Sequence, residues 1–316
     1  MIRRLQSTVS IAAAVLAVCA ISSAQDPGPT RPLGVPTDYV VTPFGYFHPS
    51  CARHVAEGET VLADGRIRHA DGTEETVAPV CDYPRYSASG SLISWDSTRA
   101  GTEPLTNGWV ENISATTTGR YGKISATWTT PPQPTGHNGQ TLFFFPGFED
   151  IDDTVSILQP VLQWGPSAAG GGNNWAAASW NCCPGGTTDY SSLISVSAGD
   201  SMLGVISPTC SSGSCSTWNV KTEDKTTGHT TTLSKTPNEG QKWNWAFGAV
   251  MEVYGVTKCS DYPNNKGLTF TVSLYNNSLA LISSPPWTKA PASGITPSCG
   301  FGLSSTATKE KVEYNP

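Results

Sequence analysis

The sequence predicts an all-β protein, an antiparallel two-sheet β-sandwich or jelly roll with a small N-terminal segment. The 316 residues include 31 glycines and 24 prolines, which favour turns over helices. Short runs of alternating polar and apolar residues follow one another, and no stretch keeps a helical period. Only 14% of the residues are charged and 38% are hydrophobic, which indicates a folded core rather than disorder.

The first 24 residues have the pattern of a secretory signal peptide. Two arginines precede an apolar stretch at residues 11–21, which is too short to span a bilayer, and cleavage is expected after Ala24. No later stretch approaches the ~20 apolar residues of a membrane span. We therefore expect a secreted, extracellular protein without a membrane partner, in which Asn112 and Asn276 are candidate glycosylation sites.

The charge pattern argues against a nucleic-acid partner. The chain has 19 basic and 25 acidic residues, a net charge of −6, and no basic stripe that could neutralise phosphates. We expect the protein to be a monomer.

Residues 25–104 are expected to form an N-terminal segment, separate from a β domain at 105–316. Residues 25–35 are rich in Pro and Gly, and 38–85 contains two Asp-Gly turn signals that suggest small hairpins. Residues 86–104 have the composition of a polar linker. The segment is predicted to cover or flank the site, either as a removable propeptide or as a permanent accessory module.

Eight cysteines follow the signal peptide, and an even number in an exported chain indicates disulfides. They are Cys51, Cys81, Cys182, Cys183, Cys210, Cys215, Cys259 and Cys299. Local spacing suggests a Cys51–Cys81 pair, and it suggests that the loop CSSGSC is closed by its own two cysteines. The adjacent Cys182 and Cys183 would then bond the two cysteines that remain, in either order.

Strand segments follow one another along the β domain. Segment 119–131 alternates and places Ile124, Ala126 and Trp128 on one face. Segment 141–148 is apolar throughout, as in a strand buried on both faces. Two of the remaining segments contain a Gly turn and are expected to be hairpins, 193–206 and 217–235, and three are single strands, 156–165, 243–256 and 267–276.

Two common kinds of site are disfavoured. A serine or cysteine nucleophile needs a histidine, and the β domain has only His137 and His229, with no G-x-S-x-G motif. His48, Cys51 and His54 have metal-like spacing, but in an oxidising compartment Cys51 is expected in a disulfide. We therefore expect no metal.

Two strand segments carry polar residues on faces that are otherwise apolar. Alternation places Gln159 and Gln163 on one face of segment 156–165, and it places Glu252 with small and apolar residues in 243–256. Burial would disfavour the charged form of Glu252 and raise its pKa, as in a catalytic acid or base. The alternative is that Glu252 points from an edge strand into solvent.

At these residues the chain resembles the glutamic peptidases of the scytalidoglutamic peptidase (eqolisin) type. Short matches to the family's motifs occur in the family's order across residues 106–285. They are TNGWVENI, YGKISATWTTPPQP, FFFPGFED, SILQPVLQWG, NNWAAASW, ISVSAGDSM, EDKTTGHTTTLSK and AVMEVY. The resemblance implies a concanavalin-like sandwich and a peptidase that needs no metal and no cofactor.

The resemblance also assigns the site. It places the catalytic glutamine on Gln159 and the catalytic glutamate on Glu252, with Phe145, Glu149, Gln163, Trp164 and Asn244 lining the site. Glu252 would activate water and Gln159 would bind the oxyanion of a protein or peptide substrate, in a reaction favoured by acid. We expect the two side chains to share one bridging water, with polar atoms roughly 3–6 Å apart.

The chain departs from the family at two lining positions, which leaves room for other functions. Glu149 stands where the family has Asp, and Gln163 stands where it has an acidic residue, so the pH optimum is expected to be higher than is usual for the family. One alternative is a carbohydrate-binding or carbohydrate-cleaving jelly roll, in which some of the ten tryptophans stack on sugars. Another is an inactive homologue that binds peptide or wall polymer.

Overall fold

The computed structural model describes residues 31–78, 81–93, 107–153 and 155–316. The expected signal peptide and most of the expected linker lie outside the described residues. Within these ranges the chain consists of strands and three short 3-10 helices, which confirms the predicted all-β fold class. In the same part of the chain, no helix has the length and hydropathy needed to cross a bilayer.

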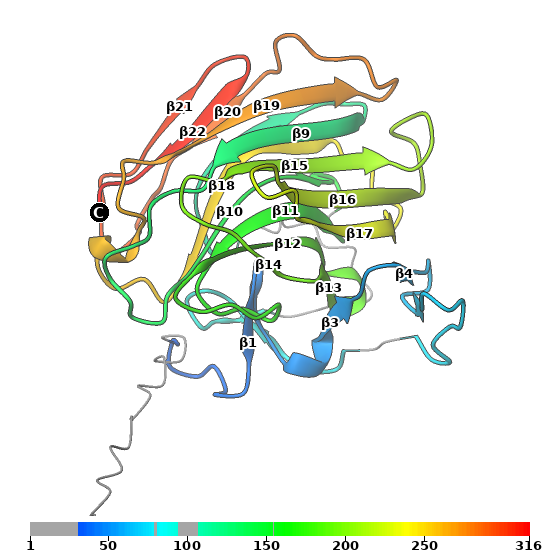
Figure 1. Cartoon of the computed structure of the whole chain (residues 1–316), viewed down its shortest axis with the longest axis horizontal. Helices are drawn as coiled ribbons and strands as arrows, with labels where there is room; N and C mark the ends of the chain where they lie inside the picture. Colours follow the sequence, from blue (N-terminus) through cyan, green and yellow to red (C-terminus); the bar gives the residue numbers. More distant parts are fainter. Residues whose placement is uncertain (1–30, 79–80, 94–106, 154) are drawn as a thin grey trace, which may run out of the picture.

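Two nine-stranded sheets pack face to face (Figure 1). Sheet I has the spatial order β20 (Thr288–Ala290), β8 (Trp109–Thr116), β18 (Trp245–Tyr254), β10 (Thr141–Glu149), β11 (Ile157–Trp164), β12 (Trp175–Cys182), β13 (Thr188–Ser191) and β3 (Ala52–Val55), with β14 (Ile194–Ser195) beside β12. Sheet II has the order β21 (Gly302–Ser305), β22 (Lys309–Glu313), β19 (Leu268–Asn276), β9 (Tyr121–Thr129), β15 (Ser201–Pro208), β16 (Thr217–Asp224), β17 (Thr230–Pro237), β4 (Thr60–Val61) and β5 (Ile67–Arg68).

Neighbouring strands of the β domain pair antiparallel, as predicted. Two parallel pairings attach the N-terminal segment: β3 pairs with β13 at one edge of sheet I, and β4 pairs with β17 at one edge of sheet II. β4 and β5 form a hairpin around Asp64 and Gly65, at one of the turn signals in the sequence. The N-terminal segment therefore adds strands to both sheets.

The side chains on one face of each strand point into the interior between the sheets. On β11 the side chains of Leu158, Leu162 and Trp164 point inward and are buried, as the alternation of segment 156–165 predicts. The sheets approach closely at Gly204 of β15, where a Cβ would lie only 2.7 Å from Cγ of Pro160. This packing fixes which side chains of β11 face the other way.

The N-terminal segment covers the face of sheet I that points away from sheet II, called here the outer face. Residues 31–93 (the covering segment) contain a small third sheet of β1 (Val40–Thr42), β2 (Gly45–Phe47), β6 (Arg85–Tyr86) and β7 (Leu92–Ile93). Its apolar side chains form one buried cluster with the outer face. The segment contributes Val35, Tyr39, Val41, Phe44, Tyr46, Phe47 and Cys51 to this cluster.

The disulfides agree only in part with the spacing argument. Cys51–Cys81 forms as expected, but Cys182 and Cys183 bond to each other and Cys259 bonds to Cys299. The expectation for Cys182 and Cys183 was therefore wrong. It assigned these two cysteines by elimination. At Cys182 strand β12 ends and the chain turns towards a 3-10 helix, so the two adjacent side chains are not held on opposite faces as they would be in a strand.

The expected bond between Cys210 and Cys215 is also absent, and both are free thiols. The sulfur of Cys215 lies 3.3 Å from Thr209 Oγ1, and the sulfur of Cys210 lies 3.6 Å from the Ser212 carbonyl oxygen. Local hydrogen bonds to the loop therefore take the place of the predicted disulfide.

Candidate active site

Glu252 is a fully buried carboxyl on the outer face of β18. It lies between Trp109 of β8 and Phe143 of β10, its pairing partners, and its exposed fraction is 0%. Tyr254 donates a hydrogen bond of 2.5 Å to Glu252 Oε1, whereas Oε2 has no partner among the described residues. Burial raises the pKa of Glu252 well above its usual value, and Tyr254 and, more weakly, the side chain of Trp109 oppose that rise.

Gln159 is a fully buried amide on the outer face of β11. The residues two positions before and after it, Ile157 and Val161, belong to the outer-face cluster. Its exposed fraction is 0%, and neither Oε1 nor Nε2 has a hydrogen-bond partner in the described parts of the chain. An amide buried without partners is costly, so this side chain is poised to bind another polar group.

Gln159 and Glu252 share the outer face but lie in different rows across it, where a row is a line of directly paired residues that runs across the strands. Glu252 pairs with Phe143 of β10, and Phe143 pairs with Gln163 of β11. Gln159 is four residues from Gln163, about 13 Å along the strand at 3.3 Å per residue. The expectation of one water between Gln159 and Glu252 does not match this register. Alternation fixes the face, whereas the row depends on the register with which the intervening β10 pairs with both strands.

Two of the predicted lining residues also lie on the outer face. Phe145 belongs to the outer-face cluster, and its ring centroid is 5.8 Å from that of Trp109. Glu149 is buried and pairs with Ile157 and Trp245, which are both members of that cluster. Side chains of directly paired residues lie on the same face of a sheet, so Glu149 contributes a second carboxyl to the outer face.

Gln163 shares the row of Glu252, and its amide is already bonded to the loop that follows β11. Its Nε2 donates to the carbonyl oxygens of Gly165 and Gly170, each at 2.8 Å, and Ser167 Oγ donates to its Oε1 at 2.8 Å. A primary amide has two N–H donors. Both are taken at Gln163, whereas those of Gln159 are not.

Trp164 and Asn244 do not line the outer face together with the others. Trp164 points into the interior, where its ring centroid is 5.4 Å from that of Trp175. Asn244 holds the loop after β10: its Nδ2 donates to Asp152 Oδ2 at 2.7 Å, and its Oδ1 accepts from the Ile151 N–H at 2.8 Å.

Tyr254 is a further residue of the site that was not among the predicted lining residues, although alternation indicates its face. Tyr254 is two residues after Glu252, so alternation places both on one face of the strand. The covering segment contributes Tyr46, whose ring meets that of Tyr254 edge-on with centroids 5.4 Å apart. No sequence pattern indicates this second contact, because it joins residues more than 200 positions apart.

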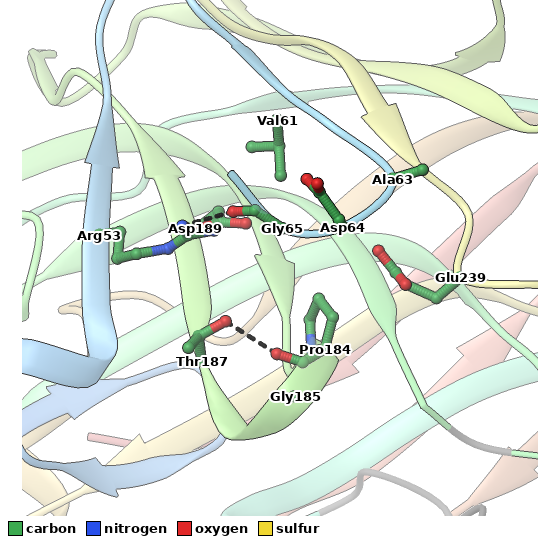
Figure 2. A pocket seen from close by; sticks show the side chains of 10 residues that line it. All are labelled: Arg53, Val61, Ala63, Asp64, Gly65, Pro184, Gly185, Thr187, Asp189 and Glu239. Carbon is green, nitrogen blue, oxygen red and sulfur yellow. Dashed lines mark hydrogen bonds and ion pairs between the residues drawn. The ribbon is translucent and has the colours of Figure 1, made fainter. Parts of the chain in front are cut away.

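A separate polar pocket of about 210 Å³ lies at the junction between the covering segment and the β domain (Figure 2). Arg53 and Asp64 from the segment meet Asp189 and Glu239 from the domain. Burial raises the pKa of Asp189 to about 6 even though Arg53 opposes the rise, and burial together with Asp189 raises that of Glu239 to about 7. In the described residues, no three His, Cys, Asp or Glu side chains are grouped to hold a metal ion.

Comparison with known proteins identifies the family. The model of the Peptidase A4 family matches residues 106–281, more than half of the 316 residues. The chain belongs to the Peptidase A4 family. This confirms the resemblance to glutamic peptidases of the scytalidoglutamic type, a class of hydrolases.

Solved structures with similar chains include members of the same class. Scytalido-glutamic peptidase with a peptide-based transition-state analogue matches with a TM-score of 0.48 and 18% identity, over 66% of this chain and 98% of that chain. SCP-B, an eqolisin in complex with the tripeptide Ala-Ile-His, matches with a TM-score of 0.47 and 17% identity over the same shares. No curated protein matches this chain.

Proposed function

We propose that this member of the Peptidase A4 family is a secreted, acid-acting endopeptidase that uses Glu252 and Gln159. The observation that carries the proposal is Glu252 itself, a buried carboxyl with one oxygen atom held by Tyr254 and the other without a partner among the described residues. A carboxyl with a raised pKa can accept and return a proton near the working pH. Secretion is supported by the signal-like N-terminus and by the disulfides.

In this mechanism Glu252 as carboxylate takes a proton from the attacking water and then gives it to the leaving amine. Gln159 lies about 13 Å along β11 from the row of Glu252, too far to contact the same carbonyl, so its amide hydrogens would instead be donated to a substrate carbonyl several residues from the scissile bond. An extended peptide advances about 3.3 Å per residue, so a substrate lying along the outer face reaches both rows. Gln159 suits the donor role better than Gln163 does, because the amide hydrogens of Gln163 are bonded to the loop.

The proposed roles are tested with purified protein on a denatured protein substrate at pH 3 to 6. Glu252→Gln should abolish hydrolysis, and Gln159→Ala, which removes a substrate-binding amide away from the scissile bond, should raise KM more than it lowers kcat. Glu310→Gln is the matched control, because Glu310 is equally buried but lies on β22 of the other sheet. A fully active Glu252→Gln protein would refute the proposal, and a loss at Gln163→Ala without one at Gln159→Ala would reassign the donor.

We further propose that the full chain is latent. Both catalytic candidates have no exposed surface beneath the aromatic side chains of the covering segment, so a substrate cannot reach them while the segment is docked. Residues 25–104 would then act as a propeptide that is cut within the polar linker at 86–104. Uncovering hydrates Glu252 and allows it to ionise in mild acid, because burial is the main cause of its raised pKa.

Mass spectrometry of the secreted protein tests the latency. A new N-terminus between Tyr86 and Thr106 that appears together with activity would support removal of the segment. Fully active material that begins at Gln25 or Asp26 would show instead that the segment is a permanent module.

A carbohydrate-binding function receives no support from the tryptophans. Five of them, Trp164, Trp175, Trp180, Trp218 and Trp243, are among the most deeply buried side chains. The large hydrophobic side chains exposed in the described parts of the chain do not include a tryptophan. A sugar-stacking platform needs exposed rings, so we do not retain this alternative.

A further inference from the structure

Tyr254 makes the shortest contact to Glu252. Its hydroxyl oxygen is 2.5 Å from Glu252 Oε1 and 3.4 Å from the carbonyl oxygen of Asn107. A phenol has one hydrogen to donate, and the shorter contact to a carboxylate takes it. Both residues are buried, so water does not compete for this hydrogen bond.

The surroundings of the pair hold the hydroxyl against the carboxyl. Phe143 packs against Tyr254 with ring centroids 6.1 Å apart, and Tyr46 of the covering segment packs at 5.4 Å. On the β8 side the backbone comes close at Gly108, where a Cβ would lie 2.8 Å from Tyr254 Oη and 3.2 Å from Glu252 Cγ. A side chain at Gly108 would therefore push the two groups apart.

Few groups face Glu252, so few neighbours influence its pKa. Tyr254 is the titratable neighbour on its own strand, and β8 and β10 contribute Trp109 and Phe143, which do not titrate, although the side chain of Trp109 also favours the ionised form of Glu252. The covering segment contributes Tyr46, with Arg31 over the ring of Tyr46 at 5.9 Å.

We propose that Tyr254 is a positioning residue that fixes Glu252 Oε1, so that Oε2 alone exchanges a proton with the attacking water and the leaving amine. This rests on the proposed function of Glu252. Tyr254 donates to the ionised carboxylate, so it stabilises the base form, and it stops the carboxyl from rotating between its two oxygen atoms. Oε1 is thereby held in a hydrogen bond that fixes the carboxyl, and Oε2 takes part in the reaction.

The test replaces Tyr254→Phe, which removes the hydroxyl and keeps the ring packing. Without the hydrogen bond the carboxylate is less stable, so the pKa of Glu252 should rise by about one unit or more. The acid limb of the kcat/KM profile should then move to higher pH by the same amount. Infrared difference spectroscopy of the full chain, with Glu252→Gln to assign the protonated carboxyl band, follows the same titration without any need for activity.

Tyr121→Phe is the matched control, because Tyr121 is also buried but stacks on Phe148 in the interior. This variant should change neither the acid limb of the kcat/KM profile nor the infrared titration of Glu252. If Tyr254→Phe does not fold, a tyrosine fluorinated at C3 at position 254 keeps the shape and strengthens the donor, so the titration of Glu252 should move to lower pH.

An unchanged Glu252 titration in the Tyr254 variants would overturn the positioning role. A shifted infrared titration in a protein that hydrolyses no substrate, even after removal of the covering segment, would support the role of Tyr254 and refute the peptidase proposal. The two failures are therefore distinguishable.

Discussion

Arg53 and Asp189 stand opposite each other on the parallel strands β3 and β13 and form a buried ion pair across the junction of the covering segment. Arg53 Nη2 lies 2.6 Å from Asp189 Oδ1, and Arg53 Nη1 donates to the Gly65 carbonyl oxygen at 2.6 Å. The guanidinium thus joins the segment to the β domain and also closes the β4–β5 hairpin onto it.

Replacing Arg53→Gln should destabilise the docked segment at neutral pH. It leaves the Asp189 carboxylate buried without its partner. Breaking a buried pair in this way lowers the free energy of unfolding by about 3–5 kcal/mol. Urea unfolding and the rate of proteolysis within the segment measure the effect. Arg53→Gln with Asp189→Asn should recover most of it, and Arg66→Gln, at a more exposed pair, should have little effect. Wild-type stability of the single variant would contradict this role.

The protein should be more stable in mild acid than in mild base. Burial raises the pKa of Glu111 and Glu310 to about 7, as it does for Glu239. A carboxyl with a raised pKa binds its proton more tightly in the folded state, so the protonated form contributes to the free energy of unfolding. This contribution is complete below pH 4 and is lost as the pH rises to 7. Thermal unfolding at pH 4 and pH 8 measures this.

Glu310→Gln provides the check on that pH dependence. It removes one titrating group and should reduce the stability difference between pH 4 and pH 8 by at most about 3 kcal/mol. A Tm that rises with pH between these values would show that the buried carboxyls are ionised in the folded protein.

Two cysteines should react with a thiol reagent in the folded protein. Burial raises the pKa of Cys215, but hydrogen bonds from Cys210 and Thr209 outweigh it and lower the pKa to about 7, so much of this thiol is ionised at neutral pH. Mass spectrometry after alkylation at pH 7 should find labels at Cys210 and Cys215, and none at the six paired cysteines. If Cys210 and Cys215 are labelled only after reduction, the predicted disulfide between them does form.

Of the two sequons, only Asn276 should carry a glycan in a eukaryotic host. Asn276 is exposed at the end of β19, and its Oδ1 accepts from Ser278 N–H at 3.0 Å. Asn112 is held in β8 between two paired strands, and its Oδ1 is buried. Glycopeptide mapping checks this: Asn276→Gln should remove the whole glycan mass, and a glycan on Asn112 would mean that β8 is open during secretion.

Local patterns were enough to predict the fold class and the faces of the two central strands. Period-two alternation correctly placed Leu158 and Trp164 in the interior and Gln159 on the opposite face, because a strand buried on both faces still has only two directions for its side chains. The same alternation placed Glu252 and Tyr254 together.

Relations between distant segments were not predictable in this way. The row of Gln159 relative to Glu252 depends on the register of β10 with both strands, which no residue pattern marked. The Cys182–Cys183 bond joins adjacent residues where a strand ends, so pairing by spacing and elimination could not anticipate it. Tyr46 reaches Tyr254 only because the whole covering segment folds back over sheet I.

The two parallel pairings of the covering segment also determine which strand edges meet the solvent. With β3 and the β4–β5 hairpin in place, β13 is paired along its outer edge from Thr188 to Ser191, and β17 is paired with β4 at Ser234. Release of the segment would turn both into bare edges, which attract other strands and promote self-association. While it is docked, the covering segment thus also protects these strand edges from pairing with other molecules.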